Sequence, residues 1–217
     1  MISRFLAIKA TQALFISLLA VTLWGCGLEK PYPAINTFSF DPPDQPAPAY
    51  NNVRPYVIRV NQLTSAAAYE TKKLIYKTSG GQMVEDFYNE LFASPGRLLA
   101  DNLATYLNHV NPYAQVVRSQ GQKGADFVLE GYLAEFLGDF TQTPPIAKIT
   151  LATTLNDVRR ESARIILART YQAQVVFQAS GDRPAAELTR ALALAWQQIL
   201  MSLSQDMDQY FSERKKP

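Results

Sequence analysis

An apolar run near the start of the chain constrains the interpretation of everything that follows it. The run covers residues 14–24, and the residues before it include two cations, Arg4 and Lys9, and no acid. A membrane-spanning helix needs about 20 consecutive apolar residues, so this run is too short to be one. A positive start, a short apolar core and a small residue at its end are typical of a secretory signal peptide. The sequence therefore predicts that the chain is exported.

Cys26 is the only cysteine of the chain, and it follows the apolar run directly after Gly25. The sequence Leu23-Trp24-Gly25-Cys26 resembles the lipobox of bacterial lipoproteins, Leu-x-Gly-Cys, in which the thiol is acylated and the bond before the cysteine is cleaved. A lone cysteine in an exported chain cannot form an internal disulfide, and acylation accounts for it. We interpret residues 1–25 as a signal peptide that is removed and Cys26 as the lipidated first residue. The alternative is a plain signal peptide with an incidental cysteine.

The charge of the chain after this cleavage argues against nucleic-acid binding. The full chain has 21 Lys and Arg residues and 19 Asp and Glu residues. Removal of Arg4 and Lys9 with the signal leaves 19 basic and 19 acidic residues, and so no formal net charge. A nucleic-acid footprint needs a clustered basic excess, which this balance does not indicate. The remaining length suits one domain with its own core.

The segment after the cysteine is predicted to be a tether. Residues 26–34 are polar and contain Pro31 and Pro33, so they favour an extended linker between the lipid and the domain at 35–217. Eight extended residues reach roughly 26 Å at about 3.3 Å each. The residue after Cys26 is Gly27, whereas enterobacteria-like sorting uses Asp there for retention in the inner membrane. Gly27 therefore predicts an outer-membrane location with the domain on the periplasmic face.

The remainder of the chain predicts an α+β fold. Ser94-Pro95 is a favourable helix start, and the apolar residues after it recur at helical spacing up to Asn111-Pro112. A second long apolar stripe, from Leu188 to Tyr210, predicts a C-terminal helix that packs on the sheet of its own domain. Alternating or β-branched segments predict strands at 35–40, 56–60, 73–77, 114–117, 125–137, 146–155 and 164–178. The expected architecture is a mixed, largely antiparallel sheet, with a C-terminal meander and two main helices packed on one face.

The sequence offers little catalytic chemistry. It has one histidine, His109, which lies near a helix end and is expected to be solvated. Zinc sites need several Cys or His ligands, and Gly80-Gly81 lacks the lysine and spacing of a phosphate-binding loop. The adjacent acids Glu85 and Asp86 are expected to be solvated on a loop. We therefore predict a protein that is not an enzyme and that uses no metal and no cofactor.

Two stretches of the chain are similar to the family of ABC-type transport auxiliary lipoproteins, which includes the lipoprotein of the paraquat-inducible system. Residues 68–77 (AYETKKLIYK) resemble the family's Tyr-Leu-Asp-Arg-Pro-x-Ile-Val-Tyr-Arg run. Residues 91–95 (LFASP) and the helix after them resemble its Arg-Trp-Ala-Glu-Pro run, with Leu91-Phe92 in place of Arg-Trp. The resemblance implies a non-catalytic partner of an MCE-domain substrate-binding protein and an ABC permease, which move lipids or other hydrophobic molecules. A structural lipoprotein that chaperones an outer-membrane protein is the alternative.

Apolar residues before the first helix, at 66–69, 87–88 and 91–92, predict an interaction surface. Clusters of exposed apolar and aromatic side chains mark such surfaces on soluble domains. We expect a partner, either the MCE component or a second copy in a homo-oligomer, to contact Tyr69, with Ala67, Ala68 and Tyr88 beside it, and we expect Phe92 to lie in the core. The alternative is that these segments fold back over the edge of the sheet.

Overall fold

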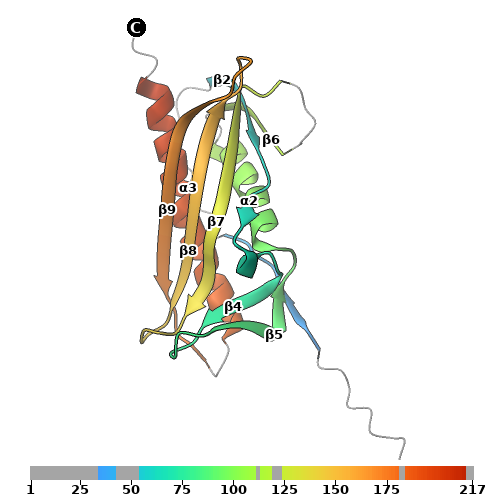
Figure 1. Cartoon of the computed structure of the whole chain (residues 1–217), viewed down its shortest axis with the longest axis vertical. Coiled ribbons are helices and arrows are strands. Elements are labelled where there is room, and N and C mark those ends of the chain that lie inside the picture. Colours follow the sequence, from blue (N-terminus) through green and yellow to red (C-terminus); the bar gives the residue numbers. More distant parts are fainter. Residues whose placement is uncertain (1–33, 43–53, 111–112, 119–123, 181–183, 214–217) are drawn as a thin grey trace, which may run out of the picture. The chain divides into compact units, whose positions relative to one another are not determined.

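Alternating apolar residues in the second half of the chain build the three longest strands of the domain. In the computed structural model, β7 (Phe127–Asp139), β8 (Ile146–Asp157) and β9 (Arg164–Val176) pair antiparallel in chain order (Figure 1). The inward side chains of β7 include Leu129 and Leu133, which are fully buried, whereas Glu130 on the same strand is exposed. Buried and exposed side chains alternate here with the period of two residues that a strand imposes. The predicted antiparallel meander is confirmed.

The structure describes residues 34–42, 54–110, 113–118, 124–180 and 184–213. Within these ranges the N-terminal half adds short strands to the meander. Their bounds are β1 (Asn36–Phe38), β2 (Arg54–Val60), β3 (Thr64–Ser65), β4 (Lys73–Lys77), β5 (Met83–Leu91) and β6 (Tyr113–Val117).

Several of these short strands join the sheet in parallel. Strands β2, β3 and β4 each pair parallel with β7, and β6 and β1 pair parallel with β2 and β5. The β4–β5 hairpin is antiparallel, as are the long pairs β7–β8 and β8–β9. The sheet is therefore mixed and largely antiparallel, and the predicted α+β class is confirmed.

The two helices begin and end close to where the sequence places them. Helix α2 (Pro95–Val110) starts at the proline, where the amide of Leu98 donates to the carbonyl of Ser94 at 3.1 Å. Helix α3 (Ala185–Glu213) packs along β8 and β9, and α2 contacts β2, β3 and β6. The helices also contact each other, so they share one side of the sheet (Figure 1).

The core lies between this helical layer and the sheet. Trp196 of α3 is fully buried, and so are Leu103 of α2 and Ile149 of β8. Gly96 allows α2 to approach the sheet, because a Cβ there would lie only 2.4 Å from the carbonyl oxygen of Leu63. The apolar stripes of both helices therefore face one continuous core, as their spacing predicts.

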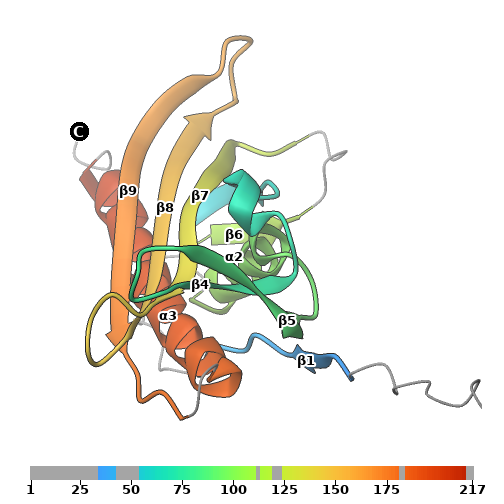
Figure 2. The ribbon, with the colours of Figure 1, turned by 60° about the horizontal axis from the view of Figure 1, so that its bottom comes forward.

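Strand β5 is the main departure from the sequence interpretation. The sequence predicts a turn and a solvated connection before α2, and the turn forms with the amide of Gly81 donating to the carbonyl of Thr78 at 2.8 Å. The connection is instead a strand that pairs with β4 on one side and with β1 on the other (Figure 2). A register shift in the β4–β5 ladder interrupts the alternation of apolar residues along β5. Regular alternation is the pattern that predicts a strand from the sequence, so this strand was not predicted.

Candidate interaction surfaces

The structure reverses two of the predictions made for the segments before α2. Tyr69 ends the short 3₁₀ turn η2 (Ala67–Tyr69), which contacts β4 and β7, and its side chain is only 5% exposed. Burial and the nearby Glu135 carboxylate raise the pKa of the Tyr69 phenol. Phe92 is 75% exposed, so it is not a core residue. The prediction of Tyr69 as an exposed anchor is wrong, because its side chain is buried in the hydrophobic core. Ala67 and Ala68 are exposed.

Four of the eight large apolar side chains that are exposed in the described part of the chain lie along the ladder between β1 and β5. Phe87 and Tyr88 are 57% and 46% exposed, and their ring centroids lie 5.1 Å apart in an edge-to-face arrangement. Ile35 precedes Asn36, which pairs with Asn89, so Ile35 lies at the level of Tyr88. At the other end of the ladder, the amide of Phe92 donates to the carbonyl of Phe38 at 3.0 Å. We call Ile35, Phe87, Tyr88 and Phe92 the β1–β5 patch.

The buried carboxylate of Asp86 stabilises the backbone that carries this patch. Asp86 is fully buried within β5, so the prediction of a solvated acid on a loop is wrong for it. Its Oδ1 accepts from the amides of Tyr88 and Asn89 at 2.9 and 3.1 Å, and its Oδ2 accepts from the Tyr76 hydroxyl at 2.9 Å. The Asn89 side chain donates to the same Oδ2 at 2.9 Å. These four donors stabilise the local chain path that leaves Phe87 and Tyr88 exposed.

The polar residues beside the patch are paired with one another. The Asn36 side chain donates to that of Asn89 at 3.0 Å, which links β1 to the site of Asp86. Glu90 contacts Lys72 at 3.1 Å and Lys73 at 3.5 Å. The hydrogen bond from Lys72, more than any other interaction, lowers the pKa of the Glu90 carboxyl. Glu90 is the one acid between Phe87 and Phe92, and its charge is therefore compensated by Lys72 and Lys73.

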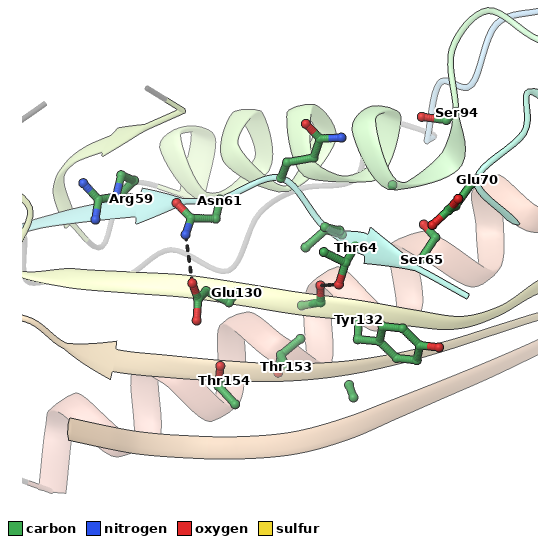
Figure 3. Close-up of a pocket in the computed structure, with 15 residues that line it drawn as sticks. Arg59, Asn61, Thr64, Ser65, Glu70, Ser94, Glu130, Tyr132, Thr153 and Thr154 are labelled. Carbon is green, nitrogen blue, oxygen red and sulfur yellow. Dashed lines mark hydrogen bonds between the residues drawn. The ribbon is translucent and has the colours of Figure 1, made fainter. Parts of the chain in front are cut away.

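A groove lined mostly by polar residues lies elsewhere on the domain, over β2, β3, β7 and β8 (Figure 3). Its volume is about 1040 Å³. The Asn61 side chain donates to Oε1 of Glu130 at 2.9 Å, and the Asn156 side chain donates to Oε2 at 3.1 Å. Hydroxyl groups of Thr64 and Ser65 also line the groove. A groove of this kind suits a polar group better than an acyl chain, because ligand pockets for apolar molecules are lined mainly by apolar side chains.

The groove does not bring together the residues that the sequence analysis considered for catalysis. His109 is exposed near the end of α2 and does not line the groove. Across the described ranges there is no cluster of three or more His, Cys, Asp or Glu side chains that would suit a metal ion. Cys26, Gly27, the signal peptide 1–25 and nearly all of the tether lie outside the described residues. Within the ranges that the structure describes, no helix has the length and apolarity needed to cross a membrane.

Strand β9 presents a long open edge. Among the described strands it pairs only with β8, and eight of its thirteen residues are exposed, whereas β8, of similar length, has none exposed. The strand contains no proline and no lysine, two of the residues that natural edge strands use to prevent pairing, and its charged residues are Arg164 and Arg169. Its charged Arg169 donates to Asp206 of α3 at 2.7 Å. The edge is therefore suited to pairing with another strand.

Comparisons with known proteins identify the fold. No family model and no curated protein matches the chain. Among solved structures, protein XCC0632 from Xanthomonas campestris, described as DUF330, is similar at 17% identity and a TM-score of 0.71, over 84% of this chain and 100% of that one. Protein CT253 from Chlamydia trachomatis is similar at 10% identity and a TM-score of 0.52, over 72% and 98%. The domain has the fold of XCC0632. At these identities the likeness concerns the fold alone.

The sequence pattern placed Phe87 and Tyr88 together in an apolar surface cluster, and both are exposed. It did not include Ile35, and it placed Phe92 in the core. The role of any of these residues in contacting a partner stays a prediction.

Proposed function

We propose that the protein is a lipid-anchored, non-catalytic auxiliary component of an MCE and ABC-type system that moves lipids or other hydrophobic molecules. The observation that carries the proposal is the lipobox-like sequence Leu23-Trp24-Gly25-Cys26. A short polar segment separates it in the sequence from a compact unit that begins at Ile35. The resemblance of residues 68–77 and 91–95 to auxiliary lipoproteins supports the same role. The fold shared with XCC0632, which extends over all of that chain, supports a single domain.

The surfaces of the domain favour contact rather than transport of a cargo within it. Ten of the fifteen residues that line the groove are polar, with Asn61 bonded to Glu130, and the most exposed large apolar residue, Phe92, lies outside it on the β1–β5 patch. A domain that carried an acyl chain would need an enclosed apolar cavity. We therefore propose an anchored domain at the periplasmic face of the outer membrane, where Gly27 after the lipidated cysteine directs it.

The anchor is tested by replacing Cys26 with serine. The wild-type protein, expressed in cells supplied with an alkyne analogue of palmitate, is expected to carry the label, and Cys26→Ser is expected to lose all of it because the acylated thiol is gone. Ser17→Ala, within the signal run, is a matched control that should keep the label. Label that persists in Cys26→Ser would overturn the lipobox interpretation.

The partner is tested by purification of the lipidated protein from its own cells after mild cross-linking. An MCE-domain protein together with an ABC permease is the expected result. A barrel or secretion component in their place would support the alternative, a lipoprotein that chaperones an outer-membrane protein. Recovery in the inner-membrane fraction of a sucrose gradient would contradict the proposed location.

A homo-oligomer is part of the proposal, and the β9 edge is the surface that suits a second copy. An antiparallel pair of β9 strands centred on Thr170 would set Arg169 opposite Tyr171 of the other copy, with no like charges opposed. Anchoring in one membrane would concentrate the copies and favour this contact.

The β9 contact is expected to fail when Thr170 becomes lysine, because the two-fold axis would then oppose two cations. Light scattering of the detergent-solubilised protein is expected to give a multiple of the monomer mass for the wild type and the monomer mass for Thr170→Lys. Gln198→Lys adds the same charge on an exposed position of α3 and should leave the mass unchanged. Equal masses for all three proteins would exclude the β9 contact.

A further inference from the structure

We propose that the β1–β5 patch is a second membrane contact, in which Ile35, Phe87, Tyr88 and Phe92 rest in the interfacial region of the bilayer that holds the lipid anchor. This inference rests on the proposed lipidation of Cys26. It differs from the partner role predicted for Tyr88, because the occupant is lipid and not protein.

The position of the patch on the chain is the first argument. Strand β1 is the first described element after the tether, and it pairs directly with the part of β5 that carries the patch (Figure 2). The segment between Cys26 and Ile35 spans at most roughly 26 Å at about 3.3 Å per residue. The chain therefore enters the domain beside these four side chains, and the patch is within reach of the surface to which the lipid is attached.

The chemistry of the patch is the second argument. Phe87 and Tyr88 lie edge to face, and Tyr88 has an apolar ring with a polar hydroxyl. Aromatic rings, tyrosine and tryptophan above all, favour the interface between water and lipid, because the ring meets apolar groups and the polar end stays solvated. Phe92 is the most exposed of the large apolar residues identified on the domain, at 75%.

The charges around the patch are the third argument. A free carboxylate would oppose contact with an anionic lipid surface and would be costly to bring out of water. Asp86 is buried with four hydrogen bonds, Glu90 is paired with Lys72 and Lys73, and Glu85, two residues before Phe87, is exposed to water. Between Phe87 and Phe92, the strand therefore presents apolar side chains, and the charge of its one acid there, Glu90, is compensated by the two lysines. Four side chains give weak binding by themselves, but a covalent anchor nearby makes a weak contact effective.

The test places a fluorescent reporter in the patch. The mature protein keeps one tryptophan, Trp196, which is fully buried in the core. Tyr88→Trp adds a second one in the patch, and Tyr132→Trp adds one at a site of equal exposure, 46%, on β7. Each lipidated protein is reconstituted into vesicles of phosphatidylethanolamine and phosphatidylglycerol whose acyl chains are brominated near the headgroup. Mass spectrometry first establishes that Cys26 carries its acyl chains.

The bromolipids are expected to quench at least half of the added emission of Tyr88→Trp and less than a tenth of that of Tyr132→Trp. Adding Phe87→Ser and Phe92→Ser to Tyr88→Trp should reduce the quenching at least twofold, with an unchanged melting curve because both side chains are exposed.

Each failure has a distinct meaning. Acylated protein in which the Tyr88→Trp reporter is not quenched would overturn the second contact and leave the anchor intact. Protein without acyl chains would overturn the proposed anchor, and this inference with it. Emission that shifts to the blue only as protein concentration rises, without quenching, would assign the patch to a second copy and not to lipid.

Discussion

Replacing Asp86 by alanine is expected to lower the free energy of unfolding by about 3–5 kcal/mol. The change removes a fully buried carboxylate and leaves the Tyr76 hydroxyl, the amides of Tyr88 and Asn89 and the Asn89 side chain without their acceptor. A buried donor that loses its partner costs its full desolvation free energy, and here several lose it together. Urea denaturation of the mature chain, followed by far-UV circular dichroism, measures the effect.

The neighbouring acid provides the control. Glu85 is exposed on the same strand, and Glu85→Ala is expected to change the free energy of unfolding by less than about 0.5 kcal/mol. Equal changes in the free energy of unfolding for Asp86→Ala and Glu85→Ala would mean that Asp86 does not stabilise the irregular part of β5. The contrast matters for function, because the same hydrogen bonds hold Phe87 and Tyr88 at the surface.

Replacing Tyr69 by alanine is expected to lower the free energy of unfolding by about 3 kcal/mol, because it empties a site in the core that the turn η2 closes. Phe92→Ala removes an exposed ring and is expected to change it by no more than about 0.5 kcal/mol. Thermal melting of the two variants side by side measures the difference. A stable Tyr69→Ala and an unstable Phe92→Ala would restore the assignment that the sequence pattern favours.

The sequence by itself determined the elements whose side chains repeat over a long distance. Strands β7, β8 and β9 have thirteen, twelve and thirteen residues, and helices α2 and α3 have sixteen and twenty-nine. Over such lengths the periods of two and of 3.6 residues are distinct, and in β7, β8, α2 and α3 the apolar positions largely coincide with those that are buried. The α+β class follows from the order of these elements.

Tertiary structure alone decided the parallel pairing of the short strands and the exposure of residues beside them. A strand of two to seven residues shows too few repeats to reveal its neighbours, and its partners come from distant parts of the chain. The register shift in the β4–β5 ladder changes which side chains of β5 face outward. The turn η2 buries Tyr69. Both effects depend on hydrogen bonds and contacts between segments, which no local period records. The β1–β5 patch could therefore be recognised only after folding placed Ile35 beside Tyr88.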